Sequence, residues 1–290
     1  MAASLKNSVP RPIRRLAREI GRRPPAGASG RTARLAARRL LHAESRDASR
    51  HGLTMVDDLD EVEQLFRDSE QNFAEIVAPY VSEFRWSLGE IYNEFFESVD
   101  AELYYAVVRR FRPKLIIEVG SGNSTSFARD ATAANGMGRI ISIDPEPRRA
   151  LPEGVEHVAS RVQDVDPALF SDLAADDVLF IDSSHTTEEA RFHTERILPS
   201  LSRGVVVHHH DILLPYLRYH MDDASTFGEP DVLLDFYLRH QDRYRVLVST
   251  SYVRYRDPEL LGRLIRSYRW HRARVPGSLW TTKIRQGTHP

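Results

Sequence analysis

The segment KLIIEVGSGNSTSFAR, residues 114–129, decides the predicted fold. Its apolar run at 115–117 is rich in β-branched residues, which is typical of a strand buried on both faces of a parallel sheet. The strand ends at Glu118, a glycine turn follows at 120–122, and residues 123–129 have the pattern of a capped helix start. Because such a turn exposes the backbone and the free N–H groups of a helix N-terminus, it predicts a nucleotide-type binding site.

A second predicted strand ends in a carboxylate. Residues 139–144 form an apolar run that closes with Asp144, 24 residues after Gly120. An acid at this place can accept hydrogen bonds from the two hydroxyls of a ribose. The third glycine of a dinucleotide motif is replaced by Thr125. Both NAD and S-adenosylmethionine carry a ribose, so this pattern alone does not choose between them.

These residues resemble the class I S-adenosylmethionine-dependent methyltransferases. EVGSG at 118–122 looks like their first motif, and the Ile-Asp pair at 143–144 looks like their second. The resemblance covers residues 98–284 and departs from the family pattern at Ser124, where many members have a third glycine. A small residue there still permits close packing of the turn.

Two further segments narrow the resemblance. FIDSSH at 180–185 and VHHHDILLP at 207–215 are similar to a bacterial, methyltransferase 24-like branch that acts on small molecules. Predicted strands alternate with predicted helices, among them a capped helix start at 98–102 and helices at 186–201 and 258–268. This alternation indicates a doubly wound α/β sheet. The resemblance adds that the fold is Rossmann-like, with seven strands of which the seventh is antiparallel.

The resemblance also implies how the cofactor is held. Gly120 and Gly122 would let S-adenosylmethionine approach the backbone, Glu118 would face its amino-acid portion, and Asp144 would bind its ribose. In the family a polar residue after the third strand meets the adenine ring. The full predicted cofactor set is Glu118, Gly120, Ser121, Gly122, Asn123, Ser124, Asp144, Gln163, Asp164 and Asp182.

Polar side chains follow the fourth and fifth predicted strands. The run at 177–181 ends at Asp182, and the run at 204–207 continues into His208, His209, His210 and Asp211. In an open α/β sheet, ligands bind beyond the carboxyl ends of the strands. Because these two strands are neighbours in the family's strand order, we expect their polar ends to meet in one site.

Two interpretations of this site stay open, with Asp182, His185 and His210 as the candidate catalytic residues. In the first, Asp182, His210 and Asp211 hold a divalent metal ion, as in metal-dependent O-methyltransferases. In the second, His185 or one of the histidines at 208–210 is a general base. A histidine nitrogen among the ligands favours Mn²⁺, Fe²⁺ or Zn²⁺ over Mg²⁺. Alternation along the strand is expected to put His208 and His210 on one face and His209 on the other. A plainer alternative is that these histidines only cap the strands and cover the core.

Composition and charge set the domain boundaries. The chain has 290 residues, 41% of them hydrophobic, and no cysteine, which excludes disulfides, thiolate catalysis and cysteine-ligated zinc. Residues 1–52 hold 13 Lys or Arg against three acids and predict a basic tail, disordered or amphipathic. Residues 53–97 predict a helical extension or lid, and 98–290 the methyltransferase domain.

The predicted activity is methylation of a hydroxyl oxygen on a small molecule such as a sugar or a natural product, with or without a metal ion. Two alternatives are a metal-dependent hydroxylase on the same scaffold and a non-catalytic anchoring or binding protein. The expected partner is a small-molecule acceptor, without specific nucleic acid. Weak contact with a membrane surface through the basic tail is a further expectation. With neither an apolar membrane span nor a signal sequence, the chain is expected to be cytoplasmic.

Overall fold

The structure is a computed structural model that describes residues 59–215, 228–269 and 275–285. The predicted basic tail, residues 1–52, lies outside the described residues, as does the start of the helical extension. Within the described part, the longest helix has 13 residues. No helix there is long and apolar enough to cross a bilayer, which takes about 20 residues.

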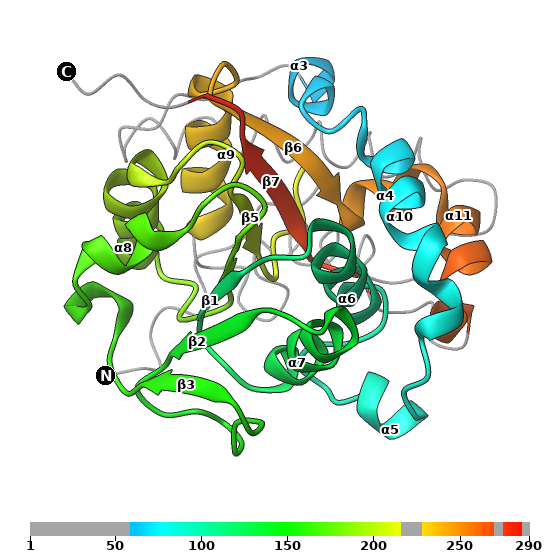
Figure 1. Cartoon of the computed structure of the whole chain (residues 1–290). Helices are drawn as coiled ribbons and strands as arrows, with labels where there is room; N and C mark the ends of the chain where they lie inside the picture. The colour runs from blue at the N-terminus through cyan, green and yellow to red at the C-terminus, as the bar shows by residue number, and fades with distance from the viewer. Residues whose placement is uncertain (1–58, 216–227, 270–274, 286–290) are drawn as a thin grey trace, which may run out of the picture.

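The core of the molecule is one seven-stranded sheet with the order β3-β2-β1-β4-β5-β7-β6 (Figure 1). Strands β1 to β5 pair in parallel, and β7 pairs antiparallel with both β5 and β6. The predicted Rossmann-like fold with an antiparallel seventh strand is therefore confirmed. The strands are β1 Leu115–Val119, β2 Arg139–Ile143, β3 Val155–Val158, β4 Val178–Ile181, β5 Val206–His209, β6 Tyr244–Ser249 and β7 Leu279–Lys283.

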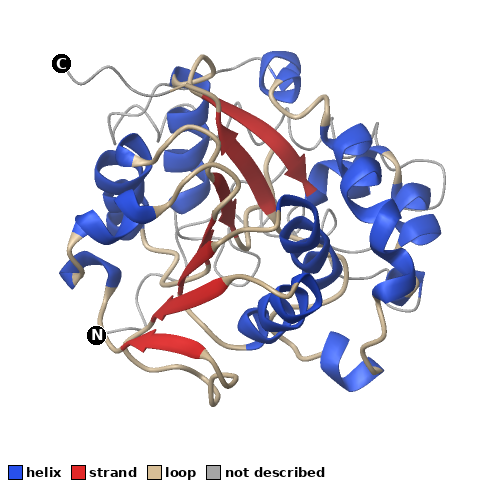
Figure 2. Ribbon diagram, in the orientation of Figure 1, coloured by secondary structure: helices blue, strands red, loops and turns tan. Residues whose placement is uncertain are grey.

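Alternating side chains on the central strands build two cores, one on each face of the sheet. Ile117 of β1 and Val207 of β5 belong to the core under α8 (Thr187–Phe192) and α9 (Glu229–Arg239). Ile116 and Val206 belong to the core under α6 (Asp100–Phe111) and α7 (Asn123–Asn135). Helices thus cover both faces of the sheet (Figure 2), as expected when apolar residues of the central strands point to both faces.

Most of the helical extension packs on the α6 face, but Val62 of its first helix belongs to the core under α8 and α9. Its described helices are α3 Leu59–Gln64, α4 Ser69–Val77 and α5 Leu88–Ile91. Phe73 and Val77 of α4 are buried in the same core as Val107 of α6. The segment that joins α5 to α6, residues 94–98, leaves this core and lines the cavity described below. The extension is therefore packed against the domain and contributes one wall of its cavity.

Several helix predictions need correction. The single helix expected at 186–201 is α8 followed by a π-turn (His193–Ile197) and a 3₁₀ turn (Leu198–Ser200). Pro199 lacks the N–H that a continuous helix needs there. Helix α10 (Thr250–Arg256) was not predicted, because its residues favour strands, and it begins where Ser249 Oγ accepts from the Tyr252 N–H at 3.2 Å. The following helix, α11, ends at Leu264 and not at 268.

Candidate functional site

A cavity of about 990 Å³ opens at the carboxyl ends of β1, β2, β4 and β5. Its volume lies at the upper end of the range for small-molecule sites, so it can hold a cofactor and an acceptor together. Most of the wall comes from segments that are far apart in sequence, and Glu189 and residues 275–276 complete it. Those segments are the 94–98 segment with Asp100, the turn 119–124, the loop after β2, residues 161–163, residues 182–185, and the residues after β5.

The two glycines of the turn after β1 differ in what limits them. Gly120 has φ +85°, and a Cβ atom there would lie 1.7 Å from the carbonyl oxygen of Asp182. Gly122 has φ +155°, and a Cβ atom there would meet nothing within 4 Å. Gly120 is therefore required by the contact between two strand ends, a packing role that the sequence did not indicate. Gly122 faces open space at the helix N-terminus, where a ligand can approach.

Asp144 links the end of β2 to this turn. Its Oδ2 accepts hydrogen bonds from the Ser121 N–H and hydroxyl, both at 2.9 Å, and its Oδ1 accepts from the Glu146 N–H at 2.8 Å. The carboxylate also lines the cavity. Oδ2 already accepts two hydrogen bonds, whereas Oδ1 accepts only one and can still accept another from a ligand. Ser121, Gly122, Asn123 and Ser124 line the same wall, and Asn123 accepts from Arg149.

Two predicted cofactor residues do not line the cavity. Glu118 is fully buried on the α6 face of β1, where its Oε1 accepts from the Tyr104 hydroxyl at 2.9 Å. Asp164 ends a 3₁₀ turn and is exposed outside the cavity. Gln163 does line it, and donates to Glu189 Oε2 at 3.2 Å. Glu118 points away from the cavity because alternation along β1 puts its side chain on the same face as Ile116. The orientation of Asp164 depends on a short 3₁₀ turn, which the sequence does not predict.

Burial raises the pKa of Glu118 to about 7, although hydrogen bonds from Thr125 and Tyr104 oppose this shift. A carboxyl group with a raised pKa in the folded state stabilises the fold below its unfolded pKa of 4.5, and this contribution is lost as the pH rises through 7. For this shift the loss amounts to about 3 kcal/mol. We expect Glu118→Gln to remove this loss. Between pH 5 and pH 8, the free energy of unfolding measured in urea should fall more for the wild type than for the variant. An equal fall in both proteins would contradict the raised pKa of Glu118.

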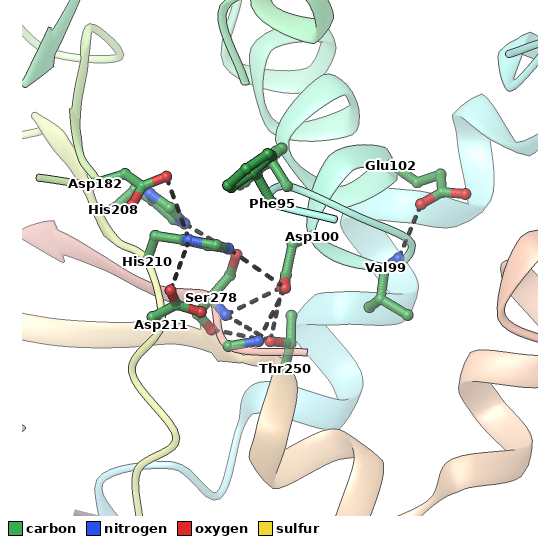
Figure 3. Close-up of polar contacts among 12 residues, drawn as sticks. Phe95, Val99, Asp100, Glu102, Asp182, His208, His210, Asp211, Thr250 and Ser278 are labelled. Carbon is green, nitrogen blue, oxygen red and sulfur yellow. Dashed lines mark hydrogen bonds and ion pairs between the residues drawn. The ribbon is translucent and has the colours of Figure 1, made fainter. Parts of the chain in front are cut away.

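The polar ends of β4 and β5 meet as predicted (Figure 3). His210 follows β5 and places its Nδ1 3.3 Å from Asp182 Oδ2 and 3.7 Å from Asp211 Oδ2. His185 places its Nε2 3.5 Å from Asp182 Oδ1 and 3.9 Å from Asp211 Oδ2. His185 and Asp211 both have φ +55°, a conformation that is uncommon for residues other than glycine. The two histidines thus face the same pair of carboxylates.

The geometry of a metal site at this place differs from the predicted one in one residue. Among the described residues, Asp182, His185 and Asp211 form a group whose ligand atoms lie within 4.8 Å of one another. The predicted ligand set contained His210, whereas the group in the structure contains His185 instead. His210 is buried, with only 4% of its side chain exposed, and its Nε2 lies 3.8 Å from Asp100 Oδ2. The loop conformation of His185, which no strand pattern predicts, brings it to the carboxylates.

Glu229 is a functional candidate that the sequence analysis did not select. It is the first residue of α9, its side chain is 7% exposed, and its Oε2 lies 2.8 Å from His185 Nδ1. Burial alone would lower the pKa of His185, but hydrogen bonds to Asp182 and Glu229 outweigh it and raise the pKa to about 10. The sequence signals were a loose match to a glutamate of the branch's pattern and the Glu-Pro start of a helix, which many helices share.

His208 and His209 belong to the core. His208 Nε2 lies 2.9 Å from the Ser278 hydroxyl, and His209 Nε2 lies 3.0 Å from the Tyr237 hydroxyl on the opposite face of the sheet. The predicted alternation, with His208 and His210 on one face, is confirmed. Burial lowers the pKa of both core histidines, that of His209 to about 3. Neither lines the cavity, so they fit the plainer interpretation.

Part of the chain that forms this site is similar to a known domain. Residues 117–212 match a family model described as a methyltransferase domain. An uncharacterised protein of Archaeoglobus fulgidus is 34% identical over an alignment of 126 positions, and the match covers 38% of this chain. The chain spans 57% of the length of that relative.

Similar solved structures include two O-methyltransferases. TomG from Streptomyces achromogenes, involved in tomaymycin synthesis and bound to S-adenosylmethionine, is 14% identical with a TM-score of 0.43, and the match covers 74% of this chain and 99% of TomG. The O-methyltransferase from Bacillus cereus in complex with S-adenosylhomocysteine is 14% identical with a TM-score of 0.42, covering 77% and 95%. These scores lie below 0.5, so the family match at 117–212 carries the assignment. Residues 117–212, which carry the glycine turn and Asp144, are thus similar to a methyltransferase domain, and the strand order of the sheet is Rossmann-like.

Proposed function

We propose that the protein transfers a methyl group from S-adenosylmethionine to a hydroxyl oxygen of a small molecule, with the help of a divalent metal ion. The observation that carries the proposal is the single cavity that joins the turn at Gly122 to Asp182, His185 and Asp211. A cofactor and an acceptor could lie side by side there, and methyl transfer by direct displacement depends on such alignment.

The residues around the turn fit the cofactor. Gly122 leaves open the space that a Cβ atom would fill, and α7 begins directly after it with unpaired N–H groups. S-adenosylmethionine supplies the activated methyl group. Asp144 would accept hydrogen bonds from the ribose hydroxyls, and Gln163 would meet the adenine. We infer these roles because Gly122, Asp144 and Gln163 follow one another along the cavity wall in the same order as the family's motifs.

The strand-end residues fit a divalent cation. Two carboxylates and one imidazole face a common point, and Glu229 behind His185 is placed to accept the Nδ1–H and leave Nε2 for a ligand. This mixture of oxygen and nitrogen donors suits Mn²⁺, Fe²⁺ or Zn²⁺ better than Mg²⁺. The ion would lower the pKa of the acceptor hydroxyl. Asp182 and Asp211 would balance its charge and fix the acceptor beside the cofactor.

The same geometry is less favourable to the alternatives. A histidine general base must be neutral, and in the metal-free site the pKa of His185 is raised to about 10, so His185 is already protonated at neutral pH. A ferrous hydroxylase typically has two histidines and one carboxylate, whereas the group here has one histidine and two carboxylates. Metal-assisted methyl transfer is therefore the function that the site supports best.

The direct test is to follow the methyl group. The purified protein, supplied with Mn²⁺, methyl-labelled S-adenosylmethionine and a panel of sugar and natural-product hydroxyl compounds, should form S-adenosylhomocysteine and a labelled methyl ether in equal amounts. Calorimetry without an acceptor should show cofactor binding. Oxygen consumption without S-adenosylhomocysteine would favour the hydroxylase, and no cofactor binding would favour a non-catalytic protein.

Asp144→Ala should weaken S-adenosylmethionine binding. Hydrogen bonds to a charged acceptor contribute about 1.5–3 kcal/mol each, so losing the ribose contacts should raise the Kd about 100-fold. The loss of the Ser121 contacts, which shape the turn, adds to this effect. Asp164→Ala is the matched control, because Asp164 is exposed outside the cavity. Calorimetry should show a normal Kd for this control, and an equal Kd for both variants would refute the ribose assignment.

A further inference from the structure

Asp100 stands at the start of α6, far in sequence from the strand-end cluster, and yet it lines the same cavity. Its side chain is 7% exposed. Val99 before it has φ +78°, which is a strained conformation for a β-branched residue. Glu102 Oε2 accepts from the Val99 N–H at 2.9 Å and holds this conformation. The chain thus maintains a costly backbone geometry at the point where Asp100 enters the site.

The carboxylate of Asp100 is fixed by three donors from the last third of the chain. Its Oδ1 accepts from the Thr250 hydroxyl at 3.0 Å and from the Ser278 N–H at 3.1 Å, and its Oδ2 accepts from the Gly277 N–H at 2.9 Å. Figure 3 shows these contacts on the side of Asp100 away from Asp182. These three hydrogen bonds position the carboxylate of Asp100 without any contribution from the strand-end cluster.

The free side of this carboxylate faces His210. Asp100 Oδ2 lies 3.8 Å from His210 Nε2, while His210 Nδ1 faces Asp182 and Asp211 on the opposite side of the ring. The Phe96 ring packs against the imidazole with centroids 4.8 Å apart. Packing against a flat ring leaves the two orientations of an imidazole about χ2 nearly equivalent, because this torsion is roughly two-fold. A carboxylate near each ring nitrogen favours one of the two orientations, because the flipped ring would turn carbon atoms toward the carboxylates.

We propose that Asp100 is a positioning residue that fixes the imidazole of His210 with Nδ1 toward Asp182 and Asp211. His210 in turn holds these two carboxylates at the spacing that the metal and the acceptor need. Asp100 therefore acts through His210 and touches neither reacting group. The catalytic consequence rests on the proposed function, whereas the orientation of His210 does not.

The test compares three variants of the full chain at one pH. Asp100→Asn removes the charge that faces His210. Thr250→Val removes one donor to Asp100 but leaves the carboxylate opposite His210. His210→Gln leaves all three hydrogen bonds to Asp100 in place and identifies the His210 signals by their absence. The measurements are long-range ¹H–¹⁵N spectra of the histidine rings, Mn²⁺ binding by electron paramagnetic resonance, cofactor Kd by calorimetry, and Tm.

We expect Asp100→Asn to shift the His210 ring signals and to weaken Mn²⁺ binding about tenfold, with the cofactor Kd within about twofold of wild type. Thr250→Val should lower Tm without either change. His210→Gln should lose Mn²⁺ affinity as Asp100→Asn does, and the double variant should lose no more than either. His210→Gln also decides the matter if Asp100→Asn does not fold, because unchanged Mn²⁺ binding there overturns the proposal.

Two further results would overturn the proposal: unshifted His210 signals in Asp100→Asn, or the same shift in Thr250→Val. A wild-type protein that binds no Mn²⁺ would contradict the proposed metal. The ring signals would then still decide whether Asp100 orients His210, so the two failures are distinguishable.

Discussion

Asp182→Asn should lower the rate of methyl transfer about 1000-fold, which corresponds to about 4 kcal/mol of lost transition-state stabilisation. Asp182 is the closer of the two carboxylates that both site histidines face, at 3.5 Å from His185 and 3.3 Å from His210. These histidines hold its pKa well below the usual range even though burial opposes this. A neutral amide removes the charge from the site and is a poorer metal ligand than a carboxylate. Single-turnover rates with saturating cofactor measure the loss.

The cofactor affinity of Asp182→Asn should stay within a few-fold of wild type, because the substitution keeps the shape of the side chain and the backbone carbonyl beside Gly120. Asp164→Asn, outside the cavity, is the matched control and should change neither quantity. Chelation of the wild type should reproduce the loss of turnover, and added Mn²⁺ should restore it. Full activity after exhaustive chelation would reject the metal. Activity should then rise with pH through the pKa of His185, about 10, as a histidine base requires.

Gly122→Val should abolish cofactor binding and leave a folded protein, whereas Gly120→Ala should fail to fold. At Gly122 the new side chain enters open cavity space, so the cost to the fold is limited to backbone strain of about 1–2 kcal/mol. At Gly120 even one methyl group would lie 1.7 Å from the Asp182 carbonyl and force β1 and β4 apart. Calorimetry and thermal unfolding measure the two effects. Normal binding by Gly122→Val, or a wild-type Tm for Gly120→Ala, would contradict these roles.

The contrast between the two glycines illustrates what sequence could and could not predict. The strand, turn and helix around Gly122, together with the carboxylate of Asp144, were predictable because they are local and their residue types are demanding. The collision at Gly120 involves a residue 62 positions later in the chain, and only the assembled sheet brings Asp182 to it. The sequence therefore indicated a binding turn without indicating which glycine the fold itself needs.

The strand-end cluster shows the same limit. Alternation along β5 correctly separated His209 from His208 and His210, since the period of a strand is fixed. The position of His185 depends on a positive φ in a loop, and Glu229 approaches from a helix 44 residues away in sequence. Neither has a periodic signal. Asp100 was predicted only as part of a capped helix start, because its contacts come from residues 250 and 277–278.

The insertion of β7 between β5 and β6 has a consequence for the order in which the protein matures during synthesis. The glycine turn, Asp144 and both strand-end carboxylates leave the ribosome well before the residues at 277–283. Two of the three groups that hold Asp100, the N–H groups of Gly277 and Ser278, leave it later, as does the strand that covers the edge of β5. Because domains tend to fold as units, a nascent chain that ends after α9 would contain every proposed ligand but lack the anchored carboxylate behind His210. Catalytic competence should therefore appear abruptly, once β7 has been translated.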